Sequence, residues 1–150
     1  PTFANARYVF GRTEFEHWRD HSEGSAHQAV FNDSVQQNAD AGKADLVASD
    51  ARLADEITLI PTPGPSPGHM SIHIKSDGEE GLLTGDVAHH PCQMAHLGWS
   101  STADSDPKQS AATRHELFSR FADTPTLVIG GHFNAGHIKR EGEAFRFIAL

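Results

Sequence analysis

Short apolar runs rich in β-branched residues recur along the sequence, and each run ends at a glycine, a proline or a polar turn. Runs of this length and composition predict β-strands. The run at residues 126–129 is apolar throughout, which predicts a strand buried on both faces. At residues 71–75 polar and apolar side chains alternate, so Ile72 and Ile74 should face one side and His73 the other, on the sheet surface. Strands are expected at residues 7–10, 56–60, 71–75, 82–86, 126–129, 136–140 and 144–147.

Two helices are expected in the first third of the chain. Residues 13–16 read Thr-Glu-Phe-Glu, a capping-box pattern that predicts the start of a helix over residues 14–22. A second helix is expected over residues 26–41, where it is ended by a glycine. Its apolar stripe is thin, and Phe31 and Val35 are expected to lie in the core rather than in the wall of a pocket.

The strongest helical pattern begins at Pro107 or Lys108 and runs to Ala122. Asp104 and Asp106 precede this proline and are expected to begin the helix rather than to bind a ligand. Arg114 is expected on its outer face. The buried face should hold Ala111, Leu117, Phe118 and Phe121. Strands and helices alternate through the chain, which predicts a mixed α/β fold.

Composition narrows the class of protein. The length of 150 residues predicts a single domain, and a net charge of −8 disfavours nucleic acid as a partner. The single cysteine, Cys92, excludes an internal disulfide and indicates a reducing, cytoplasmic location. No apolar run approaches the length of a membrane span and no signal-peptide pattern occurs, so no membrane association is expected.

Three of the predicted strands are followed closely by a side chain that binds metals. His69 lies in a Pro- and Gly-rich loop after the second expected strand, Asp86 closes the fourth, and His132 follows two glycines after the fifth. A strand end followed by glycine or proline can hold a side chain rigidly at the rim of a sheet. Three such ends in one chain predict one site.

The same three segments resemble a known family. Residues 62–69 read TPGPSPGH, residues 84–86 read TGD and residues 131–133 read GHF, and together they resemble the metallo-β-lactamase superfamily of metal-dependent hydrolases. The resemblance implies an αββα sandwich. It also implies that His69 is a metal ligand, that Asp86 is the catalytic carboxylate bridging two metals, and that His132 is the last ligand of the second metal. The intervals of 17 and 46 residues between these positions are ordinary for the family.

The sequence departs from the family pattern in two places. Pro65 stands where the first histidine of the family's TPGHTPGH loop would be, and no HxHxDH motif occurs in the 150 residues. That motif supplies the remaining metal ligands in the family. The chain therefore resembles the C-terminal part of the fold, a partial version with a mixed sheet and flanking helices. We expect a single zinc ion or partial occupancy, and completion of the fold by a homo-oligomer or by an N-terminal segment.

Other histidines and Cys92 were weighed beside these three residues. His89 and His90 follow Asp86 closely, and one of them either contacts substrate or orients a metal ligand, or the pair has no role. His17 and His21, one helical turn apart, are expected on a solvated face. Cys92 has no cationic neighbour in sequence that would lower its pKa, so it is not expected to be a nucleophile.

Three functions follow from this interpretation. The first is hydrolysis of a small ester-like substrate, namely a lactone, ester or phosphoester, by metal-activated water. The second is a non-catalytic fragment or pseudoenzyme that folds or oligomerises without activity. The third, a metal-free nucleophilic enzyme, is disfavoured because Cys92 lacks the sequence context of a nucleophile. Metal content distinguishes the first two functions from the third, and recovery of hydrolysis when the HxHxDH segment is added distinguishes the first from the second.

Overall fold

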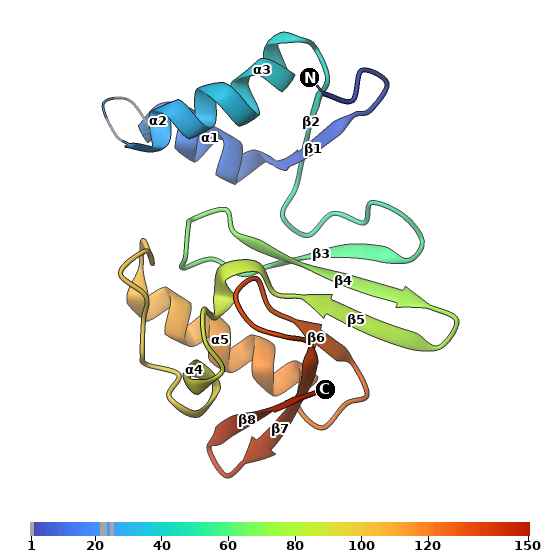
Figure 1. Cartoon of the computed structure of the whole chain (residues 1–150), viewed down its shortest axis with the longest axis vertical. Coiled ribbons are helices and arrows are strands. Elements are labelled where there is room, and N and C mark those ends of the chain that lie inside the picture. The colour runs from blue at the N-terminus through green and yellow to red at the C-terminus, as the bar shows by residue number, and fades with distance from the viewer. Residues whose placement is uncertain (1, 22–23, 25) are drawn as a thin grey trace.

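A six-stranded mixed sheet forms the larger part of the structure, a computed structural model that describes residues 2–21, 24 and 26–150 (Figure 1). Every neighbouring pair of its strands is antiparallel except β5 and β6, which run parallel at the centre. In spatial order the strands are β3 (Ile57–Pro61), β4 (Met70–Ser76), β5 (Glu79–Leu83), β6 (Leu127–Ile129), β7 (Gly136–Glu141) and β8 (Ala144–Ala149). The predicted mixed α/β class is confirmed.

The N-terminal segment forms a smaller unit beside this sheet. Its two strands pair in parallel, and helices lie between them in the chain. The elements are β1 (Tyr8–Gly11), α1 (Arg12–His21), α2 (Ala26–Phe31), η1 (Asn32–Gln36), α3 (Gln37–Asp40) and β2 (Ala44–Val47). Figure 1 shows this unit above the sheet, and the short helix α4 (Cys92–Ala95) and the long helix α5 (Pro107–Phe121) at the lower left.

The core lies between α5 and the sheet. Leu82, Phe118, Val128, Ile138 and Phe145 are all completely buried there. The start of α5 follows the sequence pattern, because the Asp106 carboxylate accepts the backbone N–H groups of Lys108 and Gln109 and Pro107 begins the helix. Large apolar side chains from one helix face and from the central strands therefore provide most of the burial that stabilises this unit.

The boundaries of the two N-terminal helices differ from the prediction. Helix α1 begins at Arg12, so Thr13 lies inside its first turn and not at the cap. Ser22, the expected last residue of this helix, lies outside the described residues. Helical structure runs from Ala26 to Asp40 as expected, but five of these residues form a π-helical turn. Phe31 is buried, whereas Val35 is only partly buried.

The prediction for β4 was wrong about which face is covered. His73 and Ser71 are buried, whereas Ile72 and Ile74 keep part of their surface exposed. The ring of His73 packs edge-on against Phe121 of α5, and its Nε2 lies 3.0 Å from a Glu80 carboxylate oxygen. A polar partner on the neighbouring strand lets the histidine take a core position that the alternating pattern assigns to the surface.

The predictions for Arg114 and Asp104 were also wrong. Arg114 has no exposed surface, and its guanidinium donates to the carbonyl oxygens of Leu97 and Val87 at 3.0 and 3.1 Å. The Asp104 carboxylate is equally buried and lies 3.6 Å from Arg114 Nη1. Because guanidinium carries five N–H donors, one side chain can satisfy several carbonyls of the segment that joins η2 (Gly85–Val87) to α5.

Within the described residues, no helix is long and apolar enough to cross a bilayer.

Replacing Arg114 tests how far the fold depends on this buried cation. Arg114→Leu leaves the Asp104 carboxylate buried without its cationic partner and two carbonyl groups without their donor, so the free energy of unfolding should fall by about 3 kcal/mol. Lys108→Leu, at an exposed position of the same helix, should change it by less than about 0.5 kcal/mol. Denaturant unfolding followed by circular dichroism measures both variants. Equal losses in the two would contradict the assignment.

Candidate metal centre

The loop that joins β3 to β4 holds His69 through backbone and hydroxyl contacts with Thr62. The Thr62 N–H donates to the His69 carbonyl at 2.9 Å, which closes the base of the loop. Thr62 Oγ1 lies 2.8 Å from His69 Nδ1, and the Thr62 carbonyl lies 3.1 Å from the same nitrogen. These contacts orient the ring so that its Nε2 points away from the loop and towards Asp86.

Asp86 lies on the short turn η2 directly after β5. Its backbone N–H donates to His69 Nε2 at 3.0 Å, so this nitrogen is an acceptor and the ring proton lies on Nδ1. Burial lowers the pKa of the His69 imidazole below its usual value, and the Asp86 carboxylate acts in the opposite direction. The neutral imidazole that results is the form that binds metals.

The loop after β6 brings His132 to the same place. The parallel pairing of β5 and β6 continues into the loops, because Thr84 N–H donates to Ile129 O at 3.0 Å and Gly131 N–H to Gly85 O at 3.4 Å. His132 Nε2 then lies 3.0 Å from Asp86 Oδ1. Both side chains are about half exposed, so they face the surface of the site rather than the core.

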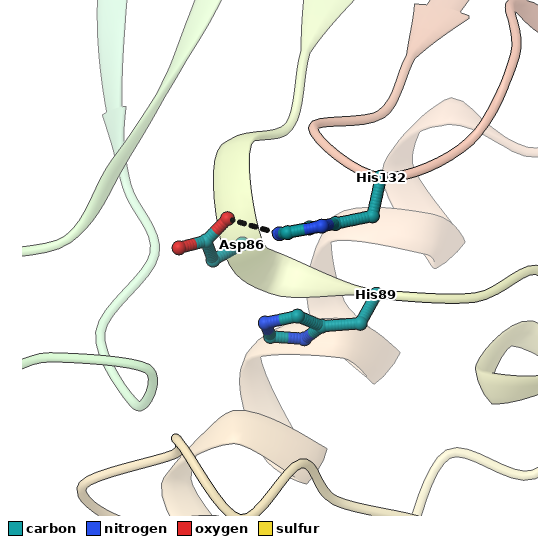
Figure 2. Close-up of side chains that lie close together, drawn as sticks. All are labelled: Asp86, His89 and His132. Carbon is teal, nitrogen blue, oxygen red and sulfur yellow. Dashed lines mark hydrogen bonds and ion pairs between the residues drawn. The ribbon is translucent and has the colours of Figure 1, made fainter.

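His89 completes a cluster of three side chains that the structure brings together. Donor atoms of Asp86, His89 and His132 all lie within 4.8 Å of one another. Figure 2 shows the three side chains converging, with the imidazole rings of His89 and His132 stacked at a centroid distance of 4.5 Å. Among the described residues, this is the group of at least three such side chains that could hold an ion.

The cluster fits a zinc ion in chemistry, and one pair of its donor atoms has suitable spacing. Two imidazoles and one carboxylate are ordinary zinc ligands, and tetrahedral coordination sets donor atoms about 3.3 Å apart. The 3.0 Å separation of His132 Nε2 from Asp86 Oδ1 is close to that value. In addition, His89 Nδ1 is buried and makes no hydrogen bond in the described part of the chain.

The sequence-predicted residues divide into two groups in the structure. Asp86 and His132 lie together as expected, and His89 joins them. His69 is outside the group of converging donor atoms but contacts the Asp86 backbone. His90 is directed elsewhere, because its Nδ1 accepts the backbone N–H of Cys92 at 3.1 Å at the start of α4.

A cavity of about 390 Å³ adjoins these residues. Its wall combines His69, Asp86 and His89 with residues of α1, α2 and the segment before α5. Lining residues include Glu14, Trp18, His27, His69, Asp86 and His89. Glu14, Trp18 and His27 had no place in the sequence-based site, because nothing in the pattern of strand ends connects the N-terminal helices to the later loops.

Known structures share this fold over almost the whole chain. The hydrolase AbOPH of the beta lactamase superfamily superposes with a TM-score of 0.82 at 21% identity, covering 99% of this chain and 56% of that one. AidC, a dizinc quorum-quenching lactonase in complex with its product N-hexanoyl-L-homoserine, gives a TM-score of 0.81 at 22% identity, with coverage of 99% and 56%. A probable metal-dependent hydrolase from Staphylococcus aureus gives 0.70 at 17% identity, with coverage of 99% and 53%.

The chain thus spans little more than half the length of these solved structures. No curated protein matches its sequence. The sequence model of the metallo-beta-lactamase superfamily matches residues 2–132, which include all three predicted metal-binding residues. Together with the fold, this match shows that the chain belongs to the metallo-beta-lactamase superfamily.

Proposed function

We propose that the chain carries part of the active centre of a metal-dependent hydrolase that acts on a lactone, ester or phosphoester. The observation that carries this proposal is the convergence of Asp86, His89 and His132 beside His69, at the mouths of adjoining loops. Superfamily membership supports hydrolysis as the reaction class. The neighbouring cavity of about 390 Å³ is large enough for a small substrate.

His69, Asp86 and His132 are the proposed metal ligands. His69 would bind through Nε2, and this bond would replace the hydrogen bond that Nε2 accepts from the Asp86 N–H. Bound zinc would supply a Lewis acid and an activated water. The Asp86 side chain is about half exposed, and the carboxylate oxygen that is not paired with His132 would be free to accept a proton. His89 is held by its backbone N–H, which donates to Gln93 Oε1 at 2.7 Å, so its ring can bind either the metal or a substrate oxygen.

A non-catalytic, metal-binding chain is the second candidate. It is favoured by the small number of converging donor atoms and by the absence of the HxHxDH motif from the 150 residues. Ligands for a second metal would then have to come from outside these residues. Zinc binding is common to both candidates, whereas hydrolysis distinguishes them.

Two glycines let the loops approach closely enough to form the cluster. Gly85 has a φ of +57°, and a Cβ at this position would lie 2.7 Å from His69 Nε2. A Cβ at Gly131 would lie 3.1 Å from the Gly85 carbonyl oxygen and 3.4 Å from Asp86 Oδ1. Side chains at these positions would therefore push the proposed ligands apart.

Metal analysis tests the proposed ligands directly. The wild-type chain should bind about one zinc per molecule, and His69→Ala, Asp86→Asn and His132→Ala should each weaken binding at least tenfold, because each removes a donor atom. His115→Ala, on the exposed face of α5, is the control and should bind as the wild type does. Elemental analysis and chelator competition provide the measurements. A wild-type chain that stays metal-free in excess zinc would refute the site.

An activity panel then distinguishes the two candidates. The zinc-loaded chain is assayed with an acyl lactone, an aryl ester and an aryl phosphotriester. Turnover of one of these that is abolished in Asp86→Asn supports the hydrolase. Stoichiometric zinc with no turnover of any substrate supports the non-catalytic chain.

Gly85→Ala tests the geometry of the loop. The substitution imposes a left-handed backbone on alanine, which costs about 1 kcal/mol, and it also forces a contact with the His69 ring. Gly142→Ala has a similar φ of +64° with no atom within 4 Å, so it shows the backbone cost alone. Unfolding and zinc titration should show a larger stability loss and about tenfold weaker binding only in Gly85→Ala. Equal behaviour of the two variants would contradict this geometry.

A further inference from the structure

The carboxylate of Glu14 joins helix α1 to the loop that carries His69. Its Oε2 accepts the hydroxyl of Ser66 at 2.8 Å and the backbone N–H of Gly68 at 3.0 Å. These partners lie more than 50 residues away in sequence. Hydrogen bonds to a charged acceptor are about twice as strong as neutral ones, so this contact is a substantial link between the two segments.

The backbone of the loop also packs directly on the start of α1. A Cβ at Gly68 would lie 2.2 Å from the Glu14 backbone nitrogen and 2.6 Å from its Cα. Such a contact can be relieved only by moving the backbone, since no flexible side-chain tip is involved. The helix and the loop are therefore in contact along their main chains as well as through the carboxylate.

Contacts inside the loop carry this anchorage to His69. The Ser66 carbonyl accepts the backbone N–H groups of His69 at 3.3 Å and of Gly64 at 3.1 Å. Holding Ser66 and Gly68 on either side therefore fixes the backbone from which the His69 side chain projects. The opposite side of the loop is held separately, because Ser105 N–H donates to Pro65 O at 3.0 Å.

The other oxygen of the same carboxylate holds part of the cavity wall. Glu14 Oε1 accepts the indole N–H of Trp18 at 2.5 Å, one helical turn further along α1. Trp18 lines the cavity next to His69 and Asp86, with its ring against that of His27 at a centroid distance of 4.7 Å. One side chain thus sets the relative position of a proposed metal ligand and of an aromatic cavity wall.

We propose that Glu14 is a positioning residue of the metal centre, which acts by fixing the His69 loop and the Trp18 ring against each other. This inference rests on the proposed function, because it takes His69 as a metal ligand. Glu14 itself is not proposed as a ligand. Both of its carboxylate oxygens are directed to donors on Ser66, Gly68 and Trp18.

The test compares Glu14→Gln with Glu16→Gln in the full chain. Gln keeps the size of the side chain but has one acceptor oxygen in place of two, and its NH₂ group would face a donor. Glu16 lies on the same helix, and its carboxylate forms an exposed ion pair with Arg12 at 3.7 Å, away from the His69 loop, so it is the matched control. Ser66→Ala, which removes only one of the three contacts, is a second variant in case Glu14→Gln does not fold.

Two measurements separate positioning from mere support of the fold. Under conditions where every variant is folded, Glu14→Gln should bind zinc about tenfold more weakly than Glu16→Gln in chelator competition. The visible spectrum of the Co²⁺-loaded chain should also change in Glu14→Gln and Ser66→Ala. In the metal-free chain, amide exchange at Gly68 should be at least tenfold faster in Glu14→Gln than in Glu16→Gln.

The outcomes are distinct. Weaker metal binding together with a changed Co²⁺ spectrum supports the proposal. Unchanged affinity and spectrum overturn it, even where stability or amide exchange changes, because Glu14 then only supports the fold. A wild-type chain that binds neither metal refutes the proposed function instead. If the wild-type chain binds no metal, amide exchange at Gly68 still tests whether Glu14 anchors the loop. Exchange that is unchanged in Glu14→Gln overturns the anchoring, whereas faster exchange supports it.

Discussion

The parallel pairing of β5 with β6 is the constraint on which the candidate site depends. Parallel neighbours end at the same edge of a sheet, so the segments that follow them must lie side by side. These segments carry Asp86 and His132, whose side chains meet at 3.0 Å. Leu82 and Val128, at the middle of the paired segment, are completely buried under α5. The position of two exposed polar residues is therefore stabilised by the burial of apolar ones.

Buried hydroxyl groups connect the remaining loop to this arrangement. Thr62 Oγ1 lies 3.2 Å from Ser71 Oγ, and the Ser71 hydroxyl donates to the Thr84 carbonyl at 3.1 Å. These three side chains are almost completely buried. Satisfied polar groups in a dry environment accept little displacement, because a broken contact leaves a buried group without a partner. The His69 loop and the Asp86 turn are thus held in register from behind the site.

The segment that crosses from β5 to β6 forms another side of the candidate site. It must return the chain to the same end of the sheet, and α5 does this while covering one face. The buried guanidinium of Arg114 holds the irregular part of the crossover, the segment that also contains His89. Its bond to the Val87 carbonyl lies two residues from His89. Because the buried Arg114 also holds the segment that carries His89, the shape of the site and the stability of the core are connected.

Local sequence patterns were sufficient for most elements and for the proposed metal-binding residues. Strand and helix signals are short-range, so the long helix α5 with its Asp106 cap and the hairpin at the C-terminus could be predicted without tertiary information. The family resemblance in residues 62–69, 84–86 and 131–133 identified the superfamily, and the match over residues 2–132 confirms it. That His69, Asp86 and His132 bind metal stays a prediction.

The tertiary structure decided which polar groups far apart in sequence meet. Arg114, Asp104 and His73 have charged or polar side chains that a periodic pattern assigns to the surface, yet they are buried, and each lies beside a partner on another segment. Glu14 looks like a solvated helical residue until the loop at residues 66–68 is folded against it. The sequence by itself determined which residues could form strands, helices and a metal site. Which polar groups meet was decided only by the fold, since hydrogen bonds require a geometry that no local pattern encodes.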